Sequence, residues 1–270
     1  MQVFGADFSG AQNPSKGIYY AQGSLSAGKL SIEQIVHCDD RLDLLTAIHF
    51  SKAPWGLDFP FSIPIEAFKR LKINDWNELV SVVVECNRKD FDFFMADSGI
   101  PSCNGICQQP SSCCRAVDAS VKSFSPLKRI NPNMRMMTYA GLKMLSYLRR
   151  FGHKVYPFDP FDPFDLSVSR IYEVYPSHGW RQVGLQLNKD LNQFVNRFYE
   201  KYGLRVSVKD NHLSMESPDA ADAVVACITM GYALYRYDLE ADWDSQHTWI
   251  SDLEWANRHQ EGLIVKLNTL

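Results

Sequence analysis

Two short apolar segments of this chain each end in an aspartate that is followed by turn-forming residues. Asp7 ends the first, VFGAD, and Asp58 ends the second, WGLD. An unpaired carboxylate inside a buried strand is very costly, so each aspartate is expected at the end of its strand. Open α/β sheets bind ligands in the crevice outside the carboxyl ends of their strands. The pattern therefore predicts an α/β fold in which Asp7 and Asp58 face such a crevice.

A third acidic pair, Asp219 and Asp222, opens a late apolar segment that has the length of a helix. Residues three apart share a helix face, and a carboxylate in the first turn is favoured by the helix dipole. Carboxylates from separate elements that meet at one point are suitable ligands for Mg²⁺ or Mn²⁺. Simpler readings remain open, because Asp219 also suits a helix start, while Asp7 and Asp58 also suit turns.

Composition limits the class of protein. The net charge of −3 over 270 residues argues against a broadly basic surface that coats nucleic acid, although a local basic cleft remains compatible. Met1 leads directly into an apolar strand, so no signal peptide is expected. No apolar run is long enough to cross a bilayer, so no membrane partner is expected. The odd number of cysteines, seven, favours a reducing, cytoplasmic location.

Hydrophobic periodicity predicts the elements in outline. Strands are expected over 2–8, 17–26, 29–37, 53–58, 155–158 and 169–175, and helices over 40–50, 73–97, 134–151, 189–202 and 218–237. The polar segment 98–133 is predicted to be a long loop, which is usually functional or an insertion. Residues 238–270 hold three tryptophans and are expected to pack back on the body. With no linker visible, residues 1–270 are predicted to form a single domain.

Five segments carry a resemblance to a known family. They are GADFS at 5–9, GLDFP at 56–60, CRAVD at 114–118, EVYP at 173–176 and DAADA at 219–223. Their order and spacing resemble the RNase H-like superfamily, with acids arranged as in Holliday-junction resolvases. The closest resemblance is to the predicted RNase H-like nucleases of the domain of unknown function 429 family. It implies an α/β fold with a mixed five-stranded sheet, an antiparallel second strand, flanking helices and insertions.

The resemblance also implies a function and a set of residue roles. It implies a metal-dependent nuclease, a hydrolase that cleaves phosphodiester bonds of nucleic acid with two Mg²⁺ or Mn²⁺ ions. Asp7 would bridge both ions, Asp58 would bind one and Asp222 the other, and these three would be the catalytic residues. Asp219 would be an accessory metal ligand.

Four further residues are candidates near this site. Glu173 alternates with apolar neighbours on its strand, so it is either an outer metal ligand or a solvent-facing residue. Arg115 has the planar guanidinium that pairs with phosphate, and with Asp118 it is a candidate for substrate binding. The alternative for Arg115 and Asp118 is a local salt bridge. Ser9, in the turn after Asp7, is the third candidate for substrate binding.

Four cysteines lie within twelve residues, at Cys103, Cys107, Cys113 and Cys114. Thiolates suit Zn²⁺, but the spacing lacks the usual paired form, so a structural metal and a disulfide are both open. The role of the surrounding loop is equally open between a lid, a metal knot and a contact in a homodimer.

Two other functions compete with the nuclease. One is a nucleotide-binding phosphotransferase of the actin-like or sugar-kinase type, whose first strand also ends in an Asp followed by small residues. Against it, that fold needs two such domains, and no second Gly-rich phosphate loop is present. The other is a non-catalytic nucleic-acid-binding or regulatory protein on the same fold. Retention of four carboxylates argues against it, because grouped carboxylates repel each other without a cation.

Overall fold

The computed structural model describes the chain except for residues 13–16, 98, 100–102, 163–164, 187–189, 210–216, 238, 240–244 and 268–270. The predicted helix start at residue 189, the first of the three late tryptophans at residue 243, and parts of the segments 98–133 and 238–270 lie outside the described residues.

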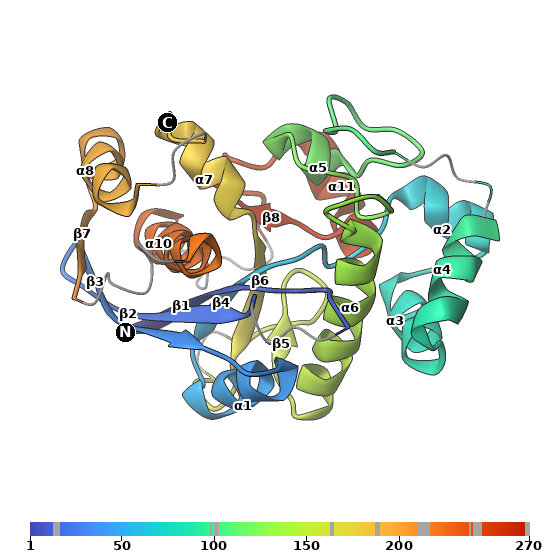
Figure 1. The fold of residues 1–270 in the computed structure, drawn as a ribbon, viewed down its shortest axis with the longest axis horizontal. Coiled ribbons are helices and arrows are strands. Elements are labelled where there is room, and N and C mark those ends of the chain that lie inside the picture. Colours follow the sequence, from blue (N-terminus) through green and yellow to red (C-terminus); the bar gives the residue numbers. More distant parts are fainter. Residues whose placement is uncertain are drawn as a thin grey trace.

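Strands and helices are interspersed along the chain (Figure 1). The strands are β1 Gln2–Asp7, β2 Tyr19–Ser26, β3 Lys29–His37, β4 Pro54–Asp58, β5 Lys154–Val155, β6 Arg170–Val174, β7 Arg205–Val208 and β8 Ile264–Val265. The helices are α1 Arg41–Ser51, α2 Ile65–Leu71, α3 Trp76–Glu85, α4 Arg88–Asp97, α5 Ala116–Val121, α6 Met134–Arg150, α7 Pro176–Gln182, α8 Leu191–Tyr202, α10 Pro218–Tyr237 and α11 Asp252–Glu261.

Several helices begin at residues that cap free backbone N–H groups. The side chains of Asp40, Asp75, Asn133 and Asp190 each accept a hydrogen bond from the first turn of α1, α3, α6 and α8. Ser251 does the same for α11, and Glu254 reciprocates in a capping box. Such caps satisfy donors that have no partner inside the helix, so they fix where each helix starts.

The strands form one open, mixed sheet. Its eight described strands run in the order β5-β6-β4-β1-β2-β3-β7, with β8 pairing with β6 off this path. Strand β2 is antiparallel to both β1 and β3, whereas β1, β4, β6, β5 and β8 pair in parallel, as do β3 and β7. The predicted α/β class with a mixed sheet and flanking helices is confirmed, but the sheet has eight strands where five were expected.

Alternation along the strands separates two hydrophobic cores. Phe4 and Ala6 of β1 point to the core shared with α1, α3 and α6, while Val3 points to the core shared with α7, α8 and α10. In β4, Trp55 and Leu57 join the α6 side. The sheet is therefore covered by helices on both faces, as expected for its central parallel strands.

Two glycines let α10 lie close to the sheet. A β-carbon on Gly5 of β1 would lie 2.0 Å from the backbone nitrogen of Cys227, and one on Gly56 of β4 would lie 2.5 Å from Cγ of Met230. No side chain fits in either space, so glycine at both positions sets the depth at which α10 packs. This close packing places the beginning of α10 near the carboxyl ends of β1 and β4.

The element predictions hold best for long, periodic segments. The order of the first five elements, three strands, a helix and a strand, is confirmed. The segment predicted as one helix over 73–97 is two helices, α3 and α4, because the chain leaves helical geometry at Cys86. The segment predicted as a loop over 98–133 contains the short helix α5, and the C-terminal segment adds α11 and β8, which pairs with β6. None of the helices among the described residues is long and apolar enough to cross a membrane.

Two buried histidines predict a loss of stability in acid. Burial is the main cause that lowers the pKa of His153 and of His178 from 6.5 to about 4. Nδ1 of His153 accepts the N–H of Ser169 at 2.9 Å, and its Nε2 lies 3.1 Å from Nδ1 of His49, so protonation would break the first of these bonds. Between pH 6.5 and about 4 the unfolded chain binds more protons than the folded one, so stability falls as pH decreases through that window.

Thermal unfolding between pH 7 and pH 4.5 measures this effect. We expect His153→Asn to reduce the slope of melting temperature against pH. Equal slopes for wild type and His153→Asn would contradict the assignment.

Candidate functional site

Asp7 and Asp58 are neighbours at the carboxyl ends of two parallel strands. Their Cα atoms are paired in the register of β1 and β4, and both residues are half-buried. Side chains alternate along a strand, so Asp7 lies on the same face as Gly5, and Asp58 on the same face as Gly56. Both glycines contact α10. The two aspartates therefore lie at the carboxyl ends of their strands, as predicted, on the face of the sheet that α10 covers. We call this place the acidic edge.

The first two turns of α10 add the second acidic pair. The helix starts after Ser217, whose Oγ accepts a hydrogen bond from the N–H of Ala220 at 3.3 Å. Asp219 lies in the first turn, and Asp222 follows on the same face. Asp222 is 8% exposed, and its Oδ1 accepts a 2.6 Å hydrogen bond from Nε1 of Trp180 on α7. This indole donor fixes the position of one carboxylate oxygen of Asp222.

A pocket of about 390 Å³ opens beside Asp7. Asp219 also lines it, as do Ser9 and Gly17, and a β-carbon on Gly17 would lie 3.3 Å from Oδ2 of Asp219. The remaining wall comes from the turn after β1, from Arg88 and from the start of α6 (Phe8, Gly10, Ala11, Asn131, Pro132, Asn133, Met136, Met137). Its size is that of a small-ligand site, and it brings the predicted residues Asp7, Ser9 and Asp219 together.

Two arginines hold the turn that follows Asp7. The guanidinium of Arg41 donates to the backbone oxygens of Ser9 and Ala11, and that of Arg88 donates to the oxygen of Gly10 at 2.8 Å. Burial and the nearby charge of Arg88 lower the pKa of Arg41. Two positive charges therefore stand beside a pocket whose other charged residues are Asp7 and Asp219. Neither arginine is marked by any local motif, so sequence reasoning missed both.

The donor chemistry of the acidic residues fits a hard divalent cation. Carboxylate oxygens are the preferred ligands, and Mg²⁺ is usually held by only one or two carboxylates together with water and substrate phosphate. Among the described residues, no three carboxylates have ligand oxygens within 4.8 Å of one another. The arrangement is therefore open: Asp7 and Asp58 are neighbours at the strand ends, and the other acidic pair lies at the start of α10. It is not a cage in which the protein supplies every ligand.

Arg115, Asp118 and Glu173 form a buried ion-pair network instead of an open surface. Nη2 of Arg115 lies 2.7 Å from Oδ1 of Asp118 and 2.6 Å from Oε1 of Glu173, and all three side chains are at most 3% exposed. Burial disfavours the charge on Arg115, but the two carboxylates outweigh it, and its pKa is raised. The salt bridge that the sequence left open for Arg115 and Asp118 is present, extended by Glu173.

The network fastens several distant segments together. Oε2 of Glu173 accepts the N–H of Phe61 at 3.0 Å, and Nη1 of Arg115 donates to the backbone oxygen of Glu261 at 3.0 Å. The carboxylate of Glu261 accepts the N–H groups of Ala116 and Ile65, each at 2.9 Å. Burial raises the pKa of Glu261. The hydrogen-bonding groups of the network are thus largely committed within the protein.

The network borders Asp58 but belongs to the opposite face of the sheet. Glu173 lies beside Leu57 in the register of β6 and β4, so it is on the face opposite Asp58. Asp58 and the three network residues line the same cavity of about 20 Å³, which has room for about one water molecule. We therefore assign Arg115, Asp118 and Glu173 to the support of the site and leave them out of the set of proposed ligands and substrate contacts.

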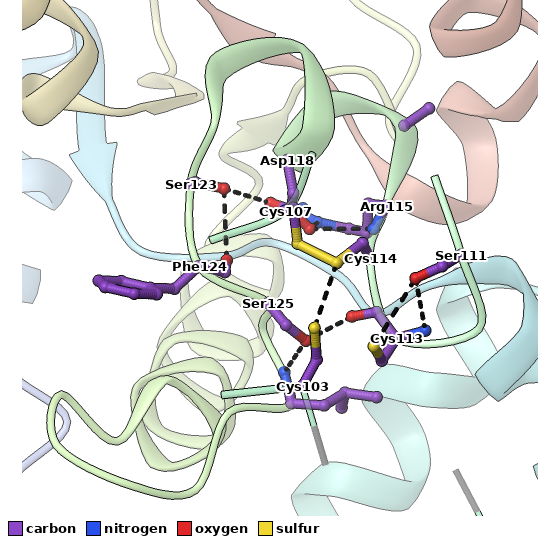
Figure 2. The surroundings of a disulfide bond; sticks show 12 residues. Cys103, Cys107, Ser111, Cys113, Cys114, Arg115, Asp118, Ser123, Phe124 and Ser125 are labelled. Carbon is purple, nitrogen blue, oxygen red and sulfur yellow. Dashed lines mark hydrogen bonds and ion pairs between the residues drawn. A yellow bond between two sulfur atoms is a disulfide. The ribbon is translucent and has the colours of Figure 1, made fainter. Parts of the chain in front are cut away.

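The four clustered cysteines lie in the loop before α5 (Figure 2). Cys107 and Cys114 form a disulfide, which was one of the two outcomes left open. Sγ of Cys103 lies 3.6 Å from Sγ of Cys114, and Sγ of Cys113 lies 3.7 Å from Oγ of Ser111. Among the described residues, the ligand atoms of Cys103, Cys107 and Cys114 form a group that could hold a metal ion.

Comparison of the chain with protein-family models, with curated proteins and with solved structures finds no match.

Proposed function

We propose that this protein is a metal-dependent nuclease that hydrolyses phosphodiester bonds of nucleic acid at the Asp7–Asp58 edge. The observation that carries the proposal is the paired register of these two aspartates on the face covered by α10, whose first two turns bring Asp219 and Asp222. Asp58 is paired with Asp7, and Asp219 lines one pocket with Asp7, at strand ends of the kind where ligands bind in open α/β sheets.

The order of the central strands supports an RNase H-like origin. The consecutive strands β3, β2, β1, β4 and β6 have an antiparallel second strand and parallel neighbours beyond it. An antiparallel second strand followed by parallel neighbours supports the proposed likeness to the domain of unknown function 429 family. Strands β5, β7 and β8 extend this core at its edges and lie away from the β1–β4 junction.

Each residue of the edge has a proposed role. Asp7, Asp58 and Asp222 hold two Mg²⁺ or Mn²⁺ ions, with Asp219 as an accessory ligand. When bound, such ions activate a water molecule and stabilise the charge on the attacking and leaving oxygens. Trp180 orients Asp222 through its indole N–H, as an outer-shell donor does for metal ligands.

The pocket beside Asp7 is the proposed position of the substrate phosphate. Ser9 offers a hydroxyl from its wall, and Arg88 is part of the same wall. The guanidinium of Arg41 donates to the backbone oxygen of Ser9 in the turn after Asp7. Positive charge near this pocket attracts the negatively charged phosphate of the substrate. The acidic residues of the site and the net charge of −3 otherwise repel that phosphate.

Replacing Asp7 with asparagine tests the proposal. We expect Asp7→Asn to lower metal-dependent cleavage by at least about 10²-fold, the scale of losing one group that stabilises a transition state. Mg²⁺ and Mn²⁺ binding, followed by titration calorimetry, should weaken in parallel. Cleavage is measured on single-stranded, duplex and branched nucleic acids, with either metal.

The matched control is Asp39→Asn, which removes a carboxylate at another strand end where the side chain is 95% exposed. It should cleave and bind metal like the wild type. Metal binding by the wild type without cleavage of any substrate would contradict the nuclease, and ATP binding in the same calorimeter would then favour the phosphotransferase. Absence of metal binding, even with nucleic acid present, would remove the basis of the site.

A further inference from the structure

The loop before α5 brings sulfur atoms together at the spacing of a metal site. The ligand atoms of Cys103, Cys107 and Cys114 lie within 4.8 Å of one another, and Sγ of Cys103 is 3.6 Å from Sγ of Cys114. A tetrahedral Zn²⁺ site with Zn–S bonds of about 2.3 Å separates its sulfurs by about 3.8 Å. The Cys103–Cys114 pair is close to this separation, and the bonded pair, Cys107 and Cys114, would have to move apart.

Cys113 precedes Cys114 in the chain and supplies the fourth thiol. Its Sγ lies 3.7 Å from Oγ of Ser111, and it is outside the group of three whose ligand atoms lie within 4.8 Å of one another. Its side chain would therefore have to turn from Ser111 toward the other three sulfurs to complete a four-thiolate site.

The loop is held in place by contacts other than the disulfide. The N–H of Cys107 donates to the oxygen of Ser123 at 2.8 Å, and Ile106 forms a β-bridge with Phe124. The hydroxyl of Ser125 donates to the backbone oxygen of Cys113 (Figure 2). The cysteines are thus positioned by the 123–125 segment, which would keep them together after reduction of the disulfide.

We propose that residues 103–114 form a Zn²⁺ site when reduced, with the thiolates of Cys103, Cys107, Cys113 and Cys114 as ligands, and that the Cys107–Cys114 disulfide is its metal-free, oxidised form. A dithiol reductant supplies two electrons and two protons. The S–S bond breaks, each sulfur takes one proton, and the reductant becomes a disulfide. Zn²⁺ then replaces the thiol protons, which pass to solvent. Closely spaced cysteines in a reducing compartment more often bind metal than form disulfides.

Zinc titration of the full chain in its two redox states tests the site. Reduced protein should have seven titratable thiols after denaturation and oxidised protein five, which verifies each preparation. We expect the reduced chain to bind one equivalent of Zn²⁺ in competition with a chromophoric chelator, and the oxidised chain to bind none at this site. Co²⁺ in place of Zn²⁺ should give the absorption of a tetrahedral thiolate complex.

Single substitutions identify the ligands. Cys103→Ser and Cys113→Ser should each weaken Zn²⁺ binding by more than the roughly 10-fold that loss of an outer-shell partner costs. Cys86→Ser, at a half-buried thiol outside the cluster, should leave it unchanged. Equal affinity of the oxidised and reduced chains, or of Cys103→Ser and Cys86→Ser, would overturn the site. Unchanged binding by Cys113→Ser would overturn the four-thiolate ligand set. The acidic edge is not involved, so none of these outcomes depends on nuclease activity.

Discussion

Replacing Arg115 with methionine should lower the free energy of unfolding by about 3–5 kcal/mol, the scale of breaking a buried ion pair from one side. Arg115 is 1% exposed and neutralises two carboxylates, on Asp118 and Glu173. Methionine keeps much of the side-chain volume but removes every donor. It would leave two buried acids facing each other, and one of them would have to take up a proton. Urea denaturation, monitored by tryptophan fluorescence, measures the loss.

Arg129→Met is the matched control. Arg129 pairs with Asp92 at 2.8 Å, but its side chain is 50% exposed, and pairs of that kind contribute at most about 1 kcal/mol. A comparable loss in the two variants would contradict the special status of Arg115. The double variant Arg115→Met with Glu173→Leu should recover part of the loss, because it removes one of the unpaired acids.

Replacing Gly5 with alanine should cost about 3 kcal/mol, at the upper end of the usual range for overpacking a core. The added β-carbon would lie 2.0 Å from the backbone nitrogen of Cys227 and 2.5 Å from the carbonyl carbon of Ala226. Both are main-chain atoms of α10, so no side-chain rotation relieves the contact and the helix itself must move. That movement carries Asp219 and Asp222 away from Asp7 and Asp58, and metal affinity should fall with stability.

Gly231→Ala provides a sharp comparison on the same helix. Its β-carbon would lie 2.9 Å from Cδ2 of Leu30, the end of a flexible side chain that can shift. Alanine also has a higher helix propensity than glycine, by up to about 1 kcal/mol. We expect Gly231→Ala to be near neutral by urea denaturation and to keep wild-type metal affinity. A near-neutral Gly5→Ala would show that α10 adjusts freely on the sheet.

The acidic edge could be predicted from the sequence because the position of each aspartate depends on its neighbours in the chain. An apolar run that ends in Asp leaves few places for the carboxylate, and the strand ends place Asp7 and Asp58 where that reasoning predicts. The face on which they lie follows from alternation with Gly5 and Gly56. Asp219 and Asp222 were visible as a pair at the start of an apolar helix, although nothing local indicated that Trp180 binds Asp222.

The ion-pair network that supports the acidic edge could not be predicted from the sequence, because its members are far apart in the chain. Arg115 and Glu173 are separated by 58 residues, and Glu261, 146 residues from Arg115, carries no motif at all. The local pattern CRAVD is compatible with both roles considered for Arg115, a phosphate contact and a salt bridge. Only the tertiary structure shows that two carboxylates enclose the guanidinium of Arg115. The cysteine pairing was equally undetermined, since four cysteines at irregular spacing do not specify which two bond.

The position of Glu261 in the network affects the order in which the chain can become native during synthesis. Residues 2–58 complete four adjacent strands early, yet the N–H groups of Ile65 and Ala116 receive their carboxylate partner only after residue 261 has been added. The β8 strand that follows then pairs with β6. This region can therefore fold only when residues near the end of the sequence contact residues far earlier in the chain. Such long-range contacts form more slowly than local ones. A nascent chain halted before residue 261 holds Arg115 and Glu173 without the segment that covers them.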